Sequence, residues 1–186
     1  MRIRDSGMPN ESYWESLFDI PLILARLGIN KSVGDVAELG CGYGTFTVPI
    51  AKAVSGTVYT FDIEQAMVDR TRQRAVGLAV QAEVRDVARE GFGVTADAVL
   101  LFNILHGENP KHLFWQAKTS LNANGRVLAI HWRHGETPRG PALNIRPRAE
   151  QIIEWAEGLV LDGGIIDLPP WHYGLSFRRP GLEKHD

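Results

Sequence analysis

The residues most clearly suited to chemistry are three glycines set two positions apart. Gly40, Gly42 and Gly44 follow a short apolar run that begins at Val36. Because glycine has no Cβ, the chain can turn sharply here and a ligand can approach its backbone closely. The amides that follow would lie at a helix N-terminus, where the helix dipole attracts anionic or polar groups. The stretch predicts a strand, a ligand-binding loop and a helix, with Cys41 as a small apolar filler in the loop.

Two acidic residues lie further along the chain, where the next predicted strands should end. Asp62 follows residues 57–61. It comes about twenty residues after the glycine loop, a spacing at which a carboxylate can accept both hydroxyls of a ribose. Asp86 ends a similar run at residues 79–85. A helix-capping role for Asp62 and a loop role for Asp86 are the structural alternatives.

The spacing of the glycines distinguishes two classes of cofactor. The dinucleotide fingerprint Gly-x-Gly-x-x-Gly would place a glycine at position 45, where this chain has Thr45. The stretch from Glu38 to Gly44 instead resembles the first motif of the class I S-adenosylmethionine-dependent methyltransferases, an acidic residue followed by alternating glycines. The resemblance implies a methyltransferase with S-adenosylmethionine as its cofactor. The alternatives are a nicotinamide-dependent oxidoreductase, for which no Tyr-x-x-x-Lys pair is present, and a protein that binds the cofactor without catalysis.

The resemblance also implies a set of cofactor contacts. In the family, the acidic residue and the loop amides hold the methionine part of the cofactor, and a carboxylate in the position of Asp86 meets the adenine amino group. Val87 would offer a backbone amide to the same ring, and Asn103 would lie on the floor of the site near the transferred methyl group. The predicted cofactor-binding residues are Glu38, Gly40, Cys41, Gly42, Gly44, Asp62, Ile63, Asp86, Val87 and Asn103.

Candidates for acid–base chemistry are three histidines near the expected strand ends. His106, His131 and His172 could act as general bases because an imidazole titrates near neutral pH, although each could equally be a hydrogen-bonded structural residue. Asn103 is not followed by Pro-Pro-Tyr or Pro-Pro-Phe, the family motif that holds a planar amino group, which argues against a nucleic-acid or amide N-methyltransferase. The chain has no cysteine pair and no His-x-x-x-His spacing, so we expect no metal.

Aromatic and basic residues near the two ends of the chain are candidates for binding the methyl acceptor. A reversed last strand would begin at the sheet edge where the parallel strands end. Aromatic side chains there would suit an apolar acceptor, and a guanidinium would suit a carboxylate or phosphate. Alternatively, the aromatic residues plug the end of the sheet and the arginines are solvated. The predicted substrate-binding residues are Tyr13, Trp14, Arg146, Trp171 and Tyr173.

The elements that would position these residues alternate between strand and helix. Five such units predict a doubly wound α/β fold, because parallel neighbours need right-handed crossovers with helices on both faces. A last pair of strands joined through Pro169 and Pro170 must be antiparallel. We therefore expect a mostly parallel seven-stranded sheet with a reversed last strand. The expected strands span 35–40, 57–61, 79–85, 96–102, 126–132, 163–168 and 171–178, and the expected helices 12–27, 44–54, 64–76, 110–121 and 147–159.

Length and composition bound the remaining possibilities. A chain of 186 residues, 44% hydrophobic, fits a single domain, in which we expect residues 1–30 to form an N-terminal helical lid and residues 31–186 the Rossmann-like methyltransferase domain. The net charge of −2 argues against broad contact with nucleic acid, so a small-molecule acceptor is the expected partner. One cysteine and no long apolar run predict a cytoplasmic protein. The oligomeric state is left open.

Overall fold

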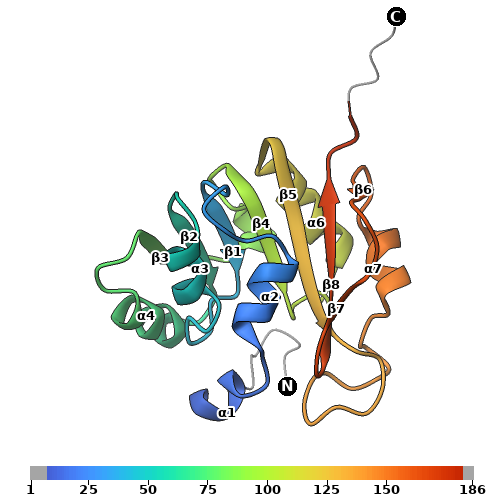
Figure 1. The fold of residues 1–186 in the computed structure, drawn as a ribbon, viewed down its shortest axis with the longest axis horizontal. Coiled ribbons are helices and arrows are strands. Elements are labelled where there is room, and N and C mark those ends of the chain that lie inside the picture. Colours follow the sequence, from blue (N-terminus) through green and yellow to red (C-terminus); the bar gives the residue numbers. More distant parts are fainter. Residues whose placement is uncertain (1–7, 182–186) are drawn as a thin grey trace, which may run out of the picture.

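A computed structural model describes residues 8–181, which form one mixed β-sheet covered by helices (Figure 1). The strand order is β3-β2-β1-β4-β5-β8-β6, with β7 also paired to β8. Strands β1 to β5 are mutually parallel, and β8 is antiparallel to β5. The predicted doubly wound fold with a reversed last strand is confirmed. The strands are β1 Val36–Leu39, β2 Val58–Asp62, β3 Val80–Val84, β4 Ala96–Phe102, β5 Leu121–Trp132, β6 Val160–Leu161, β7 Ile166–Leu168 and β8 His172–Arg178.

The sheet has eight strands rather than the predicted seven because its outer edge is interrupted. Both β6 and β7 pair with the same side of β8, Leu161 opposite Phe177 and Ile166 opposite Gly174. The residues between them include Gly163, whose φ of +88° lies in the left-handed region, so the chain leaves the ladder there. β6 and β7 therefore act as two halves of one edge strand. Counted across its width, the sheet has the predicted seven strand positions.

The helices differ from prediction mainly at the N-terminus. The helix expected over residues 12–27, bent or split at Pro21, is split into α1 and α2, because Asp19 accepts a hydrogen bond from the Leu22 amide and starts a new helix with Pro21 in its first turn. The short helix α5 was not predicted. The helices are α1 Glu11–Glu15, α2 Ile20–Arg26, α3 Thr47–Ala53, α4 Gln65–Arg74, α5 Val87–Glu90, α6 Pro110–Thr119 and α7 Ala149–Trp155.

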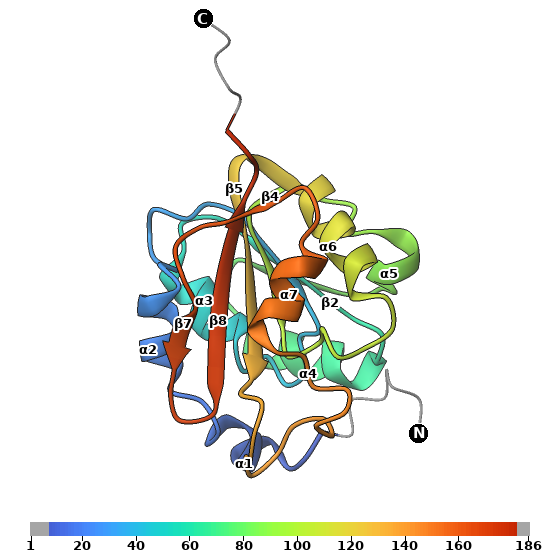
Figure 2. The ribbon, with the colours of Figure 1, turned by 90° about the vertical axis from the view of Figure 1, so that its right-hand side faces the viewer.

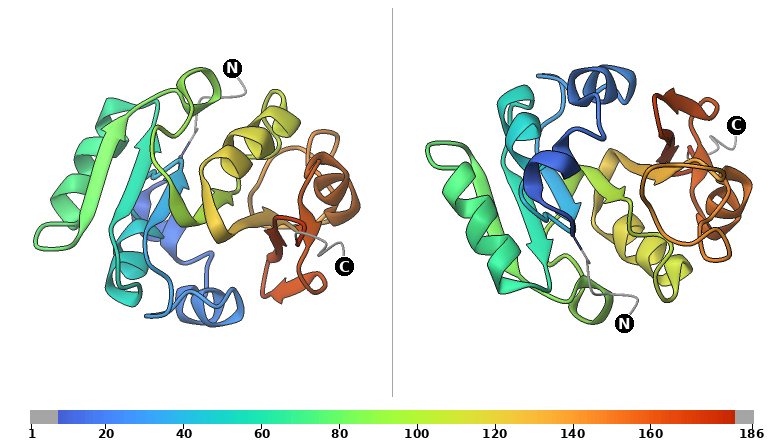
Figure 3. Two further views of the ribbon diagram at one scale, coloured as in Figure 1. Left: turned by 90° about the horizontal axis from the view of Figure 1, so that it is seen from above. Right: turned by 90° about the horizontal axis from the view of Figure 1, so that it is seen from below.

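The apolar core is divided by the sheet into two layers. Along the central strands, alternate side chains point to opposite faces, as Leu100 and Leu101 do on β4. One layer packs against α1, α2 and α3, and the other against α5, α6 and α7 (Figures 2 and 3). In the first layer Ile23 and Leu27 of the α2 segment are fully buried. Of the predicted lid, α2 is thus part of the core, and the described residues that could cover a site are those around α1.

The carboxyl ends of the parallel strands meet at one edge of the sheet, the lower edge in Figure 1. Helix α1 and the loop from residue 133 to residue 148, which follows β5, lie at the same edge. The strand order reverses between β1 and β4, whose following loops diverge to opposite faces. In open α/β sheets a ligand binds in the crevice at such a reversal. The fold therefore directs attention to the loops after β1, β2, β4 and β5.

Candidate functional site

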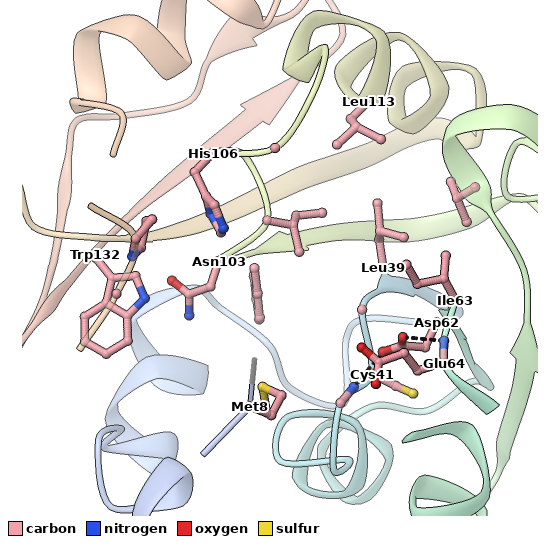
Figure 4. A pocket seen from close by; sticks show the side chains of 18 of the residues that line it. Met8, Leu39, Cys41, Asp62, Ile63, Glu64, Asn103, His106, Leu113 and Trp132 are labelled. Carbon is pink, nitrogen blue, oxygen red and sulfur yellow. Dashed lines mark hydrogen bonds between the residues drawn. The ribbon is translucent and has the colours of Figure 1, made fainter. Parts of the chain in front are cut away.

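A cavity of about 670 Å³ opens at this edge of the sheet. Figure 4 shows two ends of different character, with Met8 between them. At the carboxylate end, acidic side chains stand among apolar ones, and at the aromatic end, rings surround an amide and an imidazole. The carboxylate end is lined by Leu39, Gly40, Cys41, Gly42, Asp62, Ile63, Glu64, Asp86, Val87 and Ala88. The aromatic end is lined by Trp14, Phe46, Phe102, Asn103, Ile104, His106, Trp132 and residues 139–142 and 145.

The glycine loop after β1 forms the floor of the carboxylate end. Gly40, Gly42 and Gly44 have φ values of +82°, +51° and +77°, which side chains with a Cβ rarely adopt. Gly40 and Gly42 line the cavity, whereas Gly44 packs against Thr71 of α4 and does not. Gly40 and Gly42 therefore leave the floor of the cavity open for a ligand, and Gly44 lets the loop pack closely against α4.

Asp62 ties the end of β2 to the glycine loop. One carboxylate oxygen accepts a hydrogen bond from the Gly42 amide and the other from the Glu64 amide, each at 3.0 Å. Burial raises the pKa of Asp62 above its ordinary value, and these two bonds oppose that effect. Each oxygen has a second lone pair, so the carboxylate can still accept two hydroxyl groups from the cavity. The position suits the predicted contact with a ribose.

Glu38 lies beneath the loop rather than in the cavity. It is buried, and one carboxylate oxygen accepts hydrogen bonds from the hydroxyls of Thr47 and Thr60, at 2.5 and 2.7 Å. Burial raises the pKa of Glu38 to about 7, against the effect of these two bonds. Glu38 is not among the cavity-lining residues, so its observed contacts brace β1 against α3 and β2.

The aromatic end contains a polar pair on the turn after β4. Asn103 has a φ of +57°, and neither the nitrogen nor the oxygen of its buried amide has a hydrogen-bond partner in the described part of the chain. His106 points into the same space (Figure 4). Around them, the rings of Trp14 and Trp132 lie 6.3 Å apart between centroids. A buried amide without partners, facing a cavity, is a feature that a bound ligand would satisfy.

Of the three predicted catalytic histidines, only His106 lines the cavity. His131 is fully buried behind it, with Nε2 at 3.3 Å from Nδ1 of His106. His172 is buried between Phe18 and Trp132, at centroid distances of 4.6 and 4.2 Å. Burial lowers the pKa of both His131 and His172 to about 3, with a further contribution from nearby positive charge. Both imidazoles are therefore neutral at physiological pH.

Four of the five predicted substrate-binding residues do not line the cavity. The guanidinium of Arg146 bonds to the carbonyl oxygens of residues 133, 135 and 141, and so holds the loop after β5 in shape. The Tyr173 hydroxyl donates to the Pro147 carbonyl at 2.9 Å, on the face of the sheet that packs against α5, α6 and α7. Trp171 packs against the core, and the side chain of Tyr13 is exposed to solvent. Of the five, only Trp14 lines the cavity.

The segment around α1 covers the glycine loop. The Tyr43 hydroxyl donates to the Pro9 carbonyl at 2.7 Å, and a Cβ on Gly42 would lie 3.3 Å from the Met8 side chain. Arg74 of α4 forms ion pairs with Glu11 and Glu15 of α1, at 3.0 and 2.6 Å. Met8, at the start of this segment, lies between the two ends of the cavity in Figure 4.

Sequence reasoning missed several lining residues. Met8, Phe46 and residues 139–142 belong to no motif, and their positions depend on how distant segments pack.

Two further findings concern residues 8–181 only: no group of three or more His, Cys, Asp or Glu is placed to hold a metal ion, and none of the helices is long and apolar enough to cross a membrane.

Comparisons with known proteins support the predicted family. Residues 36–125 match the family model described as a methyltransferase domain. A SAM-dependent methyltransferase from Aquifex aeolicus is 20% identical, with a TM-score of 0.78 over 90% of this chain and 93% of that one. Magnesium protoporphyrin IX methyltransferase (ChlM) from Synechocystis PCC 6803 is 17% identical, with a TM-score of 0.67 over 96% of this chain and 91% of that one. No curated protein matches this chain in sequence.

A third similar structure is the N-methyltransferase NodS from Bradyrhizobium japonicum WM9 in complex with S-adenosylhomocysteine. It is 15% identical, with a TM-score of 0.69 over 94% of this chain and 90% of that one. The domain match and the fold together support the predicted class I S-adenosylmethionine-dependent methyltransferase superfamily. The predicted enzyme class, methyltransferase, and the predicted cofactor, S-adenosylmethionine, are confirmed by this assignment.

Proposed function

We propose that this enzyme transfers the methyl group of S-adenosylmethionine to a small, flat and largely apolar acceptor. The observation that carries the proposal is that one cavity joins a carboxylate end, built on the glycine loop and Asp62, to an aromatic end that contains Asn103 and His106. At about 670 Å³ the cavity has the size of a small-molecule site. The two ends then hold the cofactor and the acceptor side by side.

The residues of the carboxylate end fit the cofactor. Asp62 has lone pairs left for the ribose hydroxyls, and the loop backbone at Gly40 and Gly42 admits the methionine part without a Cβ in the way. Ile63 and Val87 offer apolar contacts to the adenine, with Asp86 at the same end. Two of the similar structures were solved with S-adenosylhomocysteine bound, the thioether that the cofactor leaves after transfer.

The residues of the aromatic end would position the acceptor and exclude water. S-adenosylmethionine supplies a methyl group already activated by the sulfonium charge, so much of the acceleration can come from proximity and desolvation. Trp14, Phe102 and Trp132 offer ring faces to a flat molecule. The contacts of Arg146 also bear on the expected acceptor: since this guanidinium is bonded within its own loop, the proposal requires no anionic group on the substrate.

Calorimetric titration tests the cofactor part of this proposal. S-adenosylhomocysteine should bind with a micromolar Kd, about 8 kcal/mol of binding free energy, and NADH should bind far more weakly. Tight binding of NADH without binding of the thioether would refute the proposal.

A matched pair of variants on α1 tests the acceptor part. Trp14 lines the cavity, whereas Tyr13 on the same helix is exposed to solvent. With an acceptor found by screening flat aromatic compounds, Trp14→Ala should slow transfer by about tenfold, the loss of about 1.4 kcal/mol of contact with the acceptor. Tyr13→Ala should leave it unchanged. Both variants should bind S-adenosylhomocysteine within about threefold of the parent. Equal turnover in the two variants would place the acceptor elsewhere.

A further inference from the structure

Two polar side chains that line the cavity have buried atoms without a hydrogen-bond partner. They are the hydroxyl of Thr45, a residue that is only 4% exposed, and both polar atoms of the Asn103 amide. The other buried side-chain atoms without partners in residues 8–181 belong to residues that do not line the cavity. Because leaving such atoms unpaired costs stability, a ligand that bonds to both side chains would recover that cost.

The turns that carry Thr45 and Asn103 are in contact with each other. They follow β1 and β4, which are adjacent parallel strands, so the chain leaves the sheet at neighbouring points. The rings of Phe46 and Phe102, the sequence neighbours of Thr45 and Asn103, meet edge to face with their centroids 5.1 Å apart. The backbone amide of Asn103 also donates to the Ile130 carbonyl at 2.8 Å, which fixes its turn against β5. The two side chains therefore border the same crevice, where the strand order reverses.

The backbone of Asn103 supports a role in binding. In residues 8–181, Asn103 and Asn109 are the non-glycine residues with a positive φ, at +57° and +53°. The side chain of Asn109 caps α6, because its oxygen accepts a hydrogen bond from the His112 amide at 3.2 Å. The amide of Asn103 has no such structural bond in the described chain and lines the cavity instead. A strained backbone that presents an unpaired polar group is typical of a functional site.

The strand order indicates which part of the cofactor lies in this crevice. β2 and β4 lie on opposite sides of β1. If Asp62, at the end of β2, binds the ribose, then the opposite end of the cofactor points toward the β4 side. That end carries the ammonium and carboxylate groups of the methionine part. Glu38, which was expected to hold this part, lies beneath the loop and does not line the cavity, so the two charged groups need other partners.

We propose that Thr45 and Asn103 bind the amino-carboxylate of S-adenosylmethionine. The carbonyl oxygen of the Asn103 amide accepts a hydrogen bond from the ammonium group, and the Thr45 hydroxyl donates one to the carboxylate. An amide oxygen accepts and a hydroxyl can donate, so each charged group meets a partner of the kind it requires. Both bonds are charge-assisted and hence stronger than bonds between neutral groups. The inference rests on the proposed function, which places the cofactor in this cavity.

Calorimetric titration with two nucleoside thioethers tests the proposal without an acceptor. S-adenosylhomocysteine carries the amino-carboxylate, whereas methylthioadenosine has a methyl group in place of the whole amino-acid chain. Thr45→Val and Asn103→Gly should each lower affinity for S-adenosylhomocysteine by about ten- to hundredfold, the effect of losing a hydrogen bond to a charged group. Affinity for methylthioadenosine should stay within about threefold of the parent and shows that each variant is folded. Val keeps the shape of Thr, and Gly tolerates the backbone conformation of Asn103.

Two further analogues of S-adenosylhomocysteine test each contact separately. Binding of the deaminated analogue, which keeps the carboxylate, should be weakened by Thr45→Val and unaffected by Asn103→Gly. Binding of the decarboxylated analogue, which keeps the ammonium group, should show the opposite pattern. A reversed pattern, or equal sensitivity of both analogues to both variants, would overturn the assignment of the two groups.

Thr47→Val and Asn109→Gly are the matched controls. The Thr47 hydroxyl bonds to Glu38 beneath the loop and Asn109 caps α6, so these variants should lose stability in urea unfolding without changing the ratio of the two affinities. Thr45→Ser, which keeps the hydroxyl, should bind both thioethers as the parent does. If Thr45→Val or Asn103→Gly kept the parent's ratio of affinities, the proposal would be overturned. A parent protein that bound neither thioether would instead refute the proposed function, so the two failures are distinguishable.

Discussion

The carboxylate end and the aromatic end of the cavity are built in different ways. The carboxylate end is made by short segments that directly follow strands, so that its shape depends on local turns such as the bond between Gly42 and Asp62. The aromatic end gathers side chains from α1, β4, β5 and the loop after β5, and its shape depends on long-range packing. The first end suits a ligand shared by a whole family, and the second can vary without disturbing the first.

This comparison predicts that the largest effect comes from the glycine loop. Replacing Gly42 by Val should lower affinity for S-adenosylhomocysteine by at least about a hundredfold, about 3 kcal/mol. Gly42 has a φ of +51°, and a Cβ there would crowd Met8 and point a branched side chain at the ligand. Calorimetry measures the change.

Gly77→Val is the matched control for the backbone effect. Gly77 has a φ of +80° but nothing within 4 Å of its would-be Cβ. Its replacement should cost stability through the same backbone strain and leave cofactor affinity unchanged. If both variants lost affinity equally, the loop would matter only through folding.

The second prediction concerns the carboxylate that ties β2 to the loop. Asp62→Ala should weaken S-adenosylhomocysteine binding by about ten- to hundredfold, because a hydrogen bond to a charged group contributes about 1.5–3 kcal/mol. It should also lower stability, since the amides of Gly42 and Glu64 lose their acceptor. Asp69→Ala on the exposed side of α4 is the charge-matched control and should change neither property. If Asp62→Ala bound S-adenosylhomocysteine as tightly as the parent does, Asp62 would not be the residue that binds the ribose hydroxyls.

The same contrast explains what could be predicted from the sequence. The glycine loop, Asp62 and Asp86 follow from motif and spacing, because a turn after a strand is specified by adjacent residues. Arg146 and Tyr173 were misjudged because strand register and loop closure decide their direction: Tyr173 faces the α5–α7 side of the sheet, and Arg146 turns inward to carbonyl groups of its own loop. Neither the register nor those carbonyl contacts have a signal in the local sequence.

The third prediction concerns the buried histidines behind the aromatic end. The pKa of His172 is about 3 in the fold because of burial, and about 6.5 in the unfolded chain. Below about pH 6.5 the unfolded chain therefore binds a proton that the fold excludes, and stability is lost as the pH falls. His172→Phe should reduce this acid sensitivity and stabilise the fold by about 1–3 kcal/mol, because both ring nitrogens lack partners within residues 8–181.

Urea unfolding at neutral and mildly acidic pH measures this effect. Turnover by His172→Phe should match that of the parent, because His172 does not line the cavity. A variant that folds stably but does not catalyse transfer would make His172 a candidate catalytic residue again. It would also contradict the distinction between residues that line the cavity and residues that pack behind them.

The smallest effect is expected at Glu38, beneath the carboxylate end. Glu38→Gln should change S-adenosylhomocysteine affinity by no more than about threefold, because the amide oxygen of Gln can accept both threonine hydroxyls as the carboxylate does. Its stability should respond to pH instead. Burial raises the pKa of Glu38 from 4.5 to about 7, so the parent loses stability as the pH rises between these values, and the variant should not. Above pH 7 the variant should therefore be the more stable of the two in urea unfolding, and below pH 4.5 the difference should vanish. A loss of affinity greater than about tenfold would show that the Glu38 carboxylate contacts the cofactor, and that the binding site includes a residue beneath the glycine loop.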